Sequence, residues 1–325
     1  MVIIMLNSGL IIETAELIDK YITHPSLDKS IYLSNEKRNV YLKNEGLQYT
    51  KSFKMRGAFS KILRLTEEEK KRGVVAISSG NHGVAVSYVC KILNIENVLI
   101  FVPKNTPNSK IERIKYFGAK LIIDGATYDD AHSIGMNYVK KHNMVFVDAY
   151  YEDPYIYAGQ GTIGLEILNE NENIDSIIVP IGGGGLITGI ATIVKSINPN
   201  IKIVGVQTEA CPAMKAALDD NIHYIEYPSD DSICDALIGG IGKLAFEKAS
   251  TLIDDILIVK ETTIKKATNH MITKEKYISE PSSCVVIAAL MEYDNYDFGE
   301  NVVAVMSGSN INENLMLDIL NEYSK

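Results

Sequence analysis

The chain has 325 residues, of which 46% are apolar and 22% are charged, and its formal net charge is −9. This composition is typical of a globular protein large enough for one big domain or two moderate ones, and it argues against a disordered chain. The acidic balance, without a basic cluster, argues against a nucleic-acid-binding surface, and no apolar run reaches membrane-spanning length.

The cysteines are widely separated and form no Cys-x-x-Cys pair; they are Cys90, Cys211, Cys234 and Cys284. This spacing argues against a zinc or redox site and indicates buried thiols in a reducing compartment. We therefore expect a cytoplasmic protein.

Apolar periodicity predicts the first elements of the chain: an amphipathic helix over 10–23, a short strand at 40–43 and a helix over 57–65. From residue 74 the pattern becomes a regular alternation, with strands 74–78, 98–102 and 120–123 and helices 84–93, 109–117 and 128–142. Short connections between alternating strands and helices imply parallel pairing with right-handed crossovers. The alternation is interrupted near 148–154, so residues 74–150 are predicted to form a compact small domain.

A second alternating set follows the interruption. It contains strands 176–181, 202–207, 255–259 and 301–306 and helices 161–168, 186–196, 213–219, 262–274 and 282–291. The sequence thus predicts an α/β fold with mostly parallel sheets flanked by helices.

Lys54 stands in the motif Ser52-Phe53-Lys54-Met55-Arg56-Gly57-Ala58. A lysine amine can condense with an aldehyde to form a Schiff base if it is held out of bulk water and loses its proton easily. A lone lysine at a helix start is usually a surface residue, so this motif needs support from other stretches.

Four glycines, Gly182 to Gly185, interrupt an apolar strand just before a helix begins. Residues without Cβ let several backbone N–H groups converge on one point, and the helix adds its positive end, so the loop suits a phosphate. The spacing matches neither a dinucleotide nor a nucleoside triphosphate fingerprint, which leaves a smaller phosphate ester.

A small polar turn also separates the strand and the helix within 76–88. It consists of Ser78, Ser79, Gly80, Asn81 and His82. Such a turn offers backbone and side-chain donors for a carboxylate, although alone it could be an ordinary helix N-cap.

Together the three stretches resemble the fold-type II pyridoxal-phosphate enzymes, in the branch that holds threonine and serine dehydratases and serine racemase. The likeness continues through 40–43, 158–166, 280–281 and 307–310, and it extends from about residue 10 to near the end of the chain. It implies a two-domain fold like that of the tryptophan synthase β subunit. Residues 1–73 and 151–325 would form the large cofactor-binding domain, 74–150 the small substrate-loop domain, and the cofactor would lie in the cleft between them.

The resemblance also implies the roles of individual residues. The cofactor would be pyridoxal 5′-phosphate, with Lys54 as its Schiff-base lysine and as the base that removes the α-proton. Phe53 would pack on the cofactor ring, Asn81 would bind its 3-hydroxyl, and Ser307 would face its pyridine nitrogen. The phosphate would be held by Gly182, Gly183, Gly184 and Gly185, and the substrate carboxylate by the turn from Ser78 to His82.

Ser79 matches the serine that lies opposite the lysine in the racemase, and dehydratases carry a serine there too. Asp235 and Glu280 align with acidic residues on the substrate side of the family's site. His82 is expected to be a structural hydrogen-bonding residue, because Lys54 already provides the base.

Three segments depart from the family pattern. Tyr150 and Tyr151 replace the proline-aromatic or histidine-proline pairs that are common before the Ala-Gly-Gln-Gly motif. After Asp235 the family usually has a basic, proline-bearing loop, whereas residues 235–242 here are apolar and rich in glycine, as in dehydratases resembling the hydroxyectoine-utilisation type. The racemase's divalent-metal site needs carboxylates, but Gln207 and Ala213 stand at the matching place, with Glu209 the acidic residue nearby. Hard cations need several oxygen ligands, so no metal site is expected.

The function predicted from these residues is a pyridoxal-phosphate-dependent threonine/serine ammonia-lyase. It would convert L-threonine to 2-oxobutanoate and ammonia, and L-serine to pyruvate and ammonia, as a homodimer or homotetramer. The alternatives are serine racemase, a dehydratase for another hydroxy-amino acid, and a cofactor-binding protein without chemistry. A cysteine-synthase-like transferase is less well supported, since that branch usually carries threonine where Ser79 and His82 stand.

Overall fold

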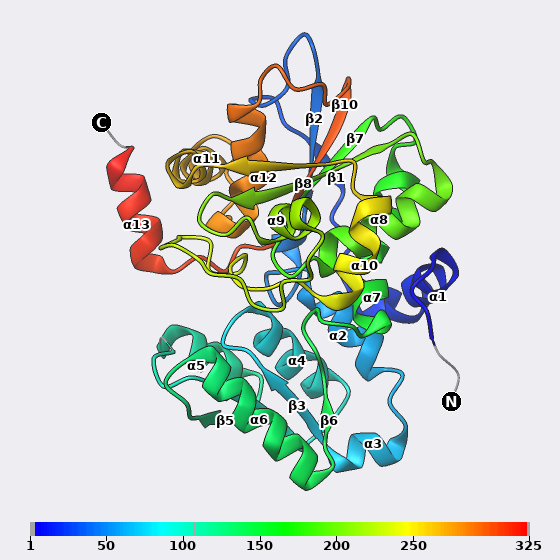
Figure 1. Ribbon diagram of the computed structural model, residues 1–325, viewed down its shortest axis with the longest axis vertical. Coiled ribbons are helices and arrows are strands. Elements are labelled where there is room, and N and C mark those ends of the chain that lie inside the picture. The colour runs from blue at the N-terminus through cyan, green and yellow to red at the C-terminus, as the bar shows by residue number, and fades with distance from the viewer. Residues whose placement is uncertain (1–3, 107, 324–325) are drawn as a thin grey trace.

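The computed structural model describes residues 4–106 and 108–323, and its strands form two separate sheets (Figure 1). The outermost residues of the expected domain ranges, 1–3 and 324–325, lie outside the described residues. The strands of the smaller sheet all fall within 74–150, while the domain limits themselves stay a prediction.

The smaller sheet has four strands in the order β5-β4-β3-β6, and all of its pairs are parallel. The strands are β3 (Val74–Ile77), β4 (Val98–Val102), β5 (Lys120–Ile123) and β6 (Val145–Phe146). Three helices connect them, namely α4 (Asn81–Ile92), α5 (Asn108–Tyr116) and α6 (Tyr128–His142). Both central strands, β3 and β4, are buried along their whole length, as expected for parallel strands covered on both faces. The alternation predicted for this region is confirmed.

The larger sheet has six strands in the order β1-β2-β10-β7-β8-β9. These are β1 (Leu27–Lys29), β2 (Asn39–Asn44), β7 (Ser176–Pro180), β8 (Lys202–Thr208), β9 (Asp255–Val259) and β10 (Asn301–Met306). Only the edge pair β1–β2 is antiparallel among the pairs of this sheet that the described residues form. The last strand in the chain, β10, therefore lies between β2 and β7.

Helices cover both faces of the larger sheet. One face packs against α1 (Ser8–Ile18), α7 (Pro154–Glu170), α8 (Gly185–Ile197), α9 (Ala213–Asp220) and α10 (Lys243–Leu252). The other face packs against α11 (Glu261–Thr273) and α12 (Pro281–Glu292). Neighbouring residues of β10 serve opposite cores, because Val303 packs with the first group and Val302 with the second.

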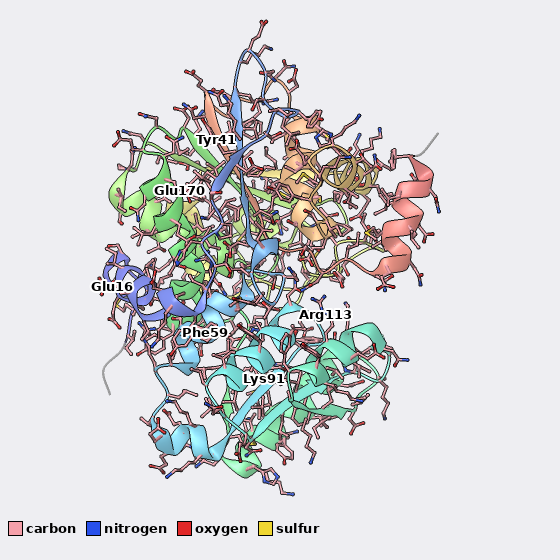
Figure 2. All side chains as sticks on the ribbon, turned by 180° about the vertical axis from the view of Figure 1, so that it is seen from behind. Glu16, Tyr41, Phe59, Lys91, Arg113 and Glu170 are labelled. Atoms are coloured by element: carbon pink, nitrogen blue, oxygen red, sulfur yellow. The ribbon has the colours of Figure 1, made fainter. Side chains whose placement is uncertain are left out.

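Helix α2 (Lys54–Ile62) joins the two parts of the molecule, since it packs against both α4 and α7. Its residue Phe59 is buried and belongs to the core that α2 shares with α4 (Figure 2). The sequence predicted this helix from residue 57, but it begins at Lys54. The candidate lysine is therefore the first residue of a helix that is held from both sides.

Several elements were not predicted. They are β1, β6, α3 (Glu67–Arg72), α10, α13 (Glu313–Glu322) and two short 3-10 helices, η1 (Asp19–Tyr21) and η2 (Glu45–Leu47). The interruption seen near 148–154 is a loop that leads into α7, and this helix begins at Pro154 instead of at residue 161. Asp153 caps this helix by accepting a hydrogen bond from the N–H of Tyr155, and proline suits the first helical position.

No helix within 4–106 and 108–323 has the length and apolar character needed to span a bilayer.

Candidate active site

A cavity of about 1140 Å³ is lined by residues from both sheets. Every residue predicted for the site lines it: Phe53, Lys54, Ser78, Ser79, Gly80, Asn81, His82, Gly182, Gly183, Gly184, Gly185, Asp235, Glu280 and Ser307. The fold thus brings the three sequence motifs into one place, although their individual roles remain predictions.

Lys54 places its amine in this cavity. The Nζ atom donates a hydrogen bond to the carbonyl of Ala149 at 3.3 Å and lies 5.3 Å from the ring centre of Phe53. Burial lowers the pKa of Lys54 from 10.5 to about 8, against the opposing effect of the Asp148 and Glu280 carboxyl groups. A sizeable fraction of the amine is therefore neutral near physiological pH, as a nucleophile or base requires.

Four helices begin at the cavity without a side-chain cap: α2, α4, α8 and α12. The first N–H groups of a helix have no partner within the helix, and they carry the positive end of its dipole. The cavity is thus surrounded by backbone donors that suit anionic groups of a ligand.

The tetraglycine loop leaves no room for side chains at its centre. A Cβ atom on Gly183 would lie 2.1 Å from Cδ2 of Tyr150, and Gly184 has a φ of 90°, which favours glycine. A Cβ atom on Gly185 would meet only Tyr150, at an ordinary 3.5 Å. The open space beside this loop therefore lies at Gly185, where α8 begins.

Glu280, Asn81 and Asn310 form a hydrogen-bonded group beside the lysine. Glu280 accepts bonds from Nδ2 of Asn81 at 2.9 Å and from the backbone N–H of Asn310 at 3.0 Å. Nδ2 of Asn310 donates in turn to the side-chain oxygen of Asn81. Burial raises the pKa of Glu280 from 4.5 to about 7, and the negative charge of Asp235 acts in the same direction.

His82 is buried, and its Nε2 lies 2.8 Å from the carbonyl oxygen of Val147, so this nitrogen carries a hydrogen and donates it. Burial, together with the positive charge of Lys54, lowers the pKa of His82 to about 3. The imidazole is therefore neutral, which agrees with the structural role expected for it.

Ser307 lies at the end of β10, directly beside the lysine segment. Its carbonyl accepts a hydrogen bond from the N–H of Phe53 at 3.1 Å, and the next residue, Gly308, forms an isolated antiparallel bridge with Ser52. Ser307 is buried and lines the cavity. The two segments are thus held in register at the site.

Sequence reasoning missed several residues of the cavity wall: Lys110, Arg113, Tyr150 and Asn310. Lys110 of α5 forms an ion pair with Asp235 at 2.5 Å, and Asp148 fixes the loop of Tyr150 by accepting backbone N–H groups. Asn310 stood in a matched motif, but nothing in the sequence showed that it contacts Asn81.

The residues at the position of the racemase metal site make other contacts. Gln207 accepts a hydrogen bond from the N–H of Lys215, and Glu209 accepts one from the N–H of Glu261. In the part of the chain that the structure describes, no group of three His, Cys, Asp or Glu side chains could hold a metal ion.

A family model described as "Pyridoxal-phosphate dependent enzyme" matches residues 22–308. The chain belongs to this family. Its members use pyridoxal phosphate, so the cofactor expected from the sequence is confirmed. One curated relative is L-threonine dehydratase biosynthetic IlvA of Halalkalibacterium halodurans, which is 38% identical over 295 residues, covering 89% of this chain and 70% of that protein.

Two solved structures extend the likeness. The processed form of threonine deaminase isoform 2 from Solanum lycopersicum has a TM-score of 0.90 and 30% identity, covering 97% of this chain and 88% of that one. Maize serine racemase has a TM-score of 0.89 and 28% identity, covering 98% of each chain. The resemblance to the fold-type II enzymes is thus confirmed over nearly the whole chain.

The residues of the cavity fit pyridoxal phosphate. The Lys54 amine could bond to its aldehyde, and the open side of the tetraglycine loop, at the uncapped start of α8, could receive its phosphate. A Cβ atom on Gly183 would clash with the ring of Tyr150, so the loop needs glycine at this position. Ser307, a neutral hydroxyl at the end of β10, could face the ring nitrogen.

Proposed function

We propose that the protein is a threonine/serine ammonia-lyase, which converts L-threonine to 2-oxobutanoate and ammonia and L-serine to pyruvate and ammonia. The observation that carries this proposal is the partly neutral amine of Lys54 in the same cavity as the uncapped starts of α4 and α8. The relative named threonine dehydratase and the neighbour named threonine deaminase support the same reaction.

When bound, pyridoxal phosphate supplies an aldehyde that reacts with amino groups and a conjugated ring that accepts electron density from the substrate. The chain's own residues bind, orient and move protons. Residues 182–185 hold the phosphate, and the turn from Ser78 to His82 orients the substrate carboxylate through backbone donors at the start of α4. Nζ of Lys54 takes up the α-proton, for which its lowered pKa suits it.

Ser307 favours elimination over transamination. A neutral hydroxyl does not keep the ring nitrogen protonated as an aspartate would, so the ring is a weaker electron sink. A substrate that has lost its α-proton then expels its β-hydroxyl promptly. The Asn81–Glu280–Asn310 group positions Asn81, the residue expected at the cofactor's 3-hydroxyl.

Serine racemase is the second candidate, favoured by the overall likeness to the maize enzyme and by Ser79 on the cavity wall. Racemisation needs a proton donor on the face opposite Lys54, and Ser79 is the residue assigned to that face. Formation of D-serine that disappears in Ser79→Ala, while pyruvate release continues, would establish this activity.

The decisive assay measures keto-acid release from L-threonine by the purified protein supplied with pyridoxal phosphate. Release of 2-oxobutanoate supports the ammonia-lyase. Intact cofactor absorbance without any keto acid would contradict it, and the loop at 235–242 would then indicate a different hydroxy-amino acid.

Lys54→Ala is expected to abolish both turnover and the visible absorbance of the bound cofactor. The other lysine among the described residues that line the cavity is Lys110, and its amine is held in an ion pair with Asp235. Lys71→Ala, at an exposed position of α3, serves as the control and should keep both signals. Full activity of Lys54→Ala would remove the basis of the assignment.

The assembly is proposed as a homodimer or homotetramer in the cytoplasm. Analytical ultracentrifugation of the holoenzyme measures the number of subunits directly.

A further inference from the structure

Arg113 is a cation of the cavity wall that the reaction above does not use. It lies on α5 one helical turn after Lys110, so the two side chains share one face of the helix, and both line the cavity. Figure 2 shows Arg113 on the side of the smaller sheet that faces the rest of the molecule.

The two cations differ in their partners. Lys110 forms its ion pair with Asp235. Among the side chains that the structure describes, none forms an ion pair or a hydrogen bond with the guanidinium of Arg113. The carboxyl group that raises the pKa of Arg113 belongs to Glu280, whose two oxygens already accept bonds from Asn81 and Asn310.

A partly buried cation without a partner is costly, because it gives up water and receives no charge in return. Burial accordingly lowers the pKa of Arg113. A planar guanidinium binds carboxylates through two parallel hydrogen bonds. The missing counter-charge of Arg113 therefore fits a carboxylate of the ligand.

The position of Arg113 indicates which carboxylate this is. The phosphate cradle at 182–185 begins α8 of the larger sheet, whereas α5 packs against α4, at whose start the α-carboxylate turn lies. That turn supplies its own backbone donors. The loop that continues the wall past Asp235 offers only apolar residues and glycines over 236–240.

We propose that Arg113 binds a second carboxylate, on the side chain of the substrate, so that the site accepts β-hydroxy-α-amino dicarboxylic acids such as 3-hydroxyaspartate. This rests on the proposed ammonia-lyase. The α C–H and β C–O bonds break, the hydroxyl leaves as water with one proton, and water then hydrolyses the enamine to a 2-oxo acid and ammonia. For 3-hydroxyaspartate the products are oxaloacetate and ammonia, and the water released equals the water consumed.

The test compares kcat/KM for 3-hydroxyaspartate and L-threonine in the holoenzyme. In Arg113→Met the ratio of the two values should fall about 10- to 100-fold, the loss expected for a charge-assisted hydrogen-bonded pair. Arg113→Lys keeps the positive charge but cannot form two parallel hydrogen bonds, so the ratio should fall by a smaller factor. Lys115→Met removes a cation from an exposed position of the same helix that does not line the cavity, and it should leave the ratio unchanged.

Binding provides a second measurement that does not depend on turnover. L-aspartate and L-asparagine lack a β-hydroxyl and differ in charge at the side chain, and calorimetry on the holoenzyme should find aspartate the tighter ligand in the wild type but not in Arg113→Met. An equal loss of kcat/KM for threonine and for 3-hydroxyaspartate in Arg113→Met would overturn the proposal, because Arg113 would then hold the α-carboxylate or the cofactor. The proposal would also be overturned if the wild type turned over threonine but bound aspartate no more tightly than asparagine. Preference for aspartate without any elimination would support Arg113 and contradict the ammonia-lyase instead.

Discussion

Lys54 and Glu280 face the same cavity with charges of opposite sign, and burial moves their pKa values toward each other, to about 8 and about 7. Each residue therefore has a mixed protonation state near neutral pH. A general base must be neutral when it takes up a proton and protonated afterwards, and pKa values near the working pH allow both states.

The rate at which the apoenzyme takes up pyridoxal phosphate should rise with pH and level off above about 8, because only the neutral Lys54 amine reacts with an aldehyde. Stopped-flow absorbance measures this rate. Pyridoxine phosphate, which lacks the aldehyde, is the control, since its binding involves the phosphate site but not the amine. An identical pH dependence for both compounds would contradict the role of Lys54.

Glu280→Gln should gain stability relative to the wild type as pH rises. The folded-state pKa of Glu280 lies above its unfolded value, so the wild type loses stability between about pH 4.5 and 7, while the neutral glutamine does not. The difference in unfolding free energy between the two proteins should change by up to about 3 kcal/mol from pH 4 to pH 8. Urea unfolding of the apoproteins measures it, and a difference that is independent of pH would show that Glu280 titrates normally.

At the scale of elements, the helix starts at the cavity differ from those of two surface helices, although α9, α10 and α11 also begin without a side-chain cap. The surface helices α3 and α6 begin with complete capping boxes, at Thr66 and Thr127. The four helices around the cavity lack side-chain caps, so their first N–H groups are available to anionic groups of a ligand.

Gly185→Ala tests the cradle without disturbing the fold. The new methyl group would meet only Tyr150, at an ordinary distance, so the apoprotein should be as stable as the wild type. It would occupy the space assigned to the phosphate, and the affinity for pyridoxal phosphate should fall about tenfold or more, which corresponds to about 1.4 kcal/mol or more. Equilibrium titration of cofactor absorbance measures the change. Unchanged affinity would place the phosphate elsewhere.

Apart from β1, β6 and α10, the strands of both sheets and the helices that connect them could be predicted, because their apolar periodicity reflects the faces that they bury. Helix α3 could not, since its six residues are all charged and it is stabilised by a capping box that apolar periodicity does not detect. Strand β6 has only two residues, and it is stabilised by pairing with β3, whose partner residues lie 71 positions earlier in the chain. The local sequence carries no signal of such a distant pairing.

The candidate site was predictable to the extent that its chemistry lies in contiguous motifs. The resemblance identified Lys54, the polar turn and the tetraglycine loop, and the cavity contains them all. Arg113 and Asn310 carry no local signal, because what distinguishes them is a contact or a missing contact with residues far away in the chain.

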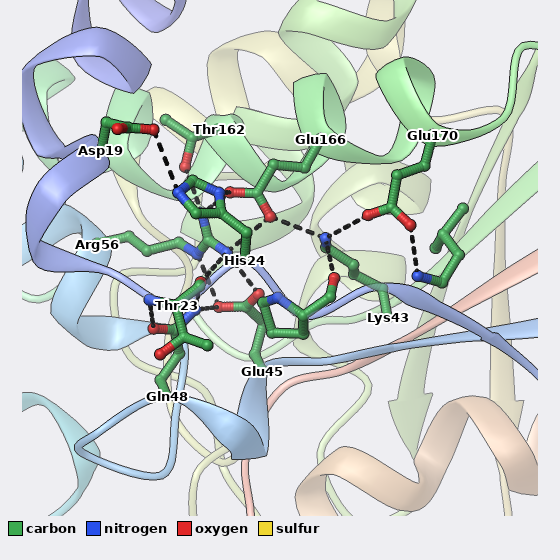
Figure 3. A network of polar contacts seen from close by, with 12 residues as sticks. Asp19, Thr23, His24, Lys43, Glu45, Gln48, Arg56, Thr162, Glu166 and Glu170 are labelled. Atoms are coloured by element: carbon green, nitrogen blue, oxygen red, sulfur yellow. Dashed lines mark hydrogen bonds and ion pairs between the residues drawn. The ribbon is translucent and has the colours of Figure 1, made fainter.

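At the scale of the molecule, a buried charged network supports the helix that carries Lys54 (Figure 3). Arg56 of α2 is fully buried and bonds to Glu45 and Glu166, and Lys43 forms a further ion pair with Glu166 at 2.8 Å. Although burial opposes it, the two carboxylates raise the pKa of Arg56. The network connects β2, α2 and α7.

Glu45→Gln should destabilise the protein by about 2–4 kcal/mol, because it leaves a buried guanidinium with only one carboxylate. Denaturant unfolding measures this loss. Glu67→Gln removes one partner of an exposed pair on α3 and should have no measurable effect. Equal stability of the two variants would mean that water reaches Arg56.

The position of β10 has a consequence for how the protein is made. A ribosome completes the smaller sheet once residue 146 has emerged, but β2 pairs with the rest of its sheet only through β10, which ends at residue 306. At about 5–20 residues per second, the first strands wait roughly tens of seconds for the strand that joins them to β7. During translation the nascent chain therefore exposes one edge of β2 without its partner strand, and the segment of Lys54 gains its hydrogen bond from Phe53 to Ser307 only after β10 has been synthesised.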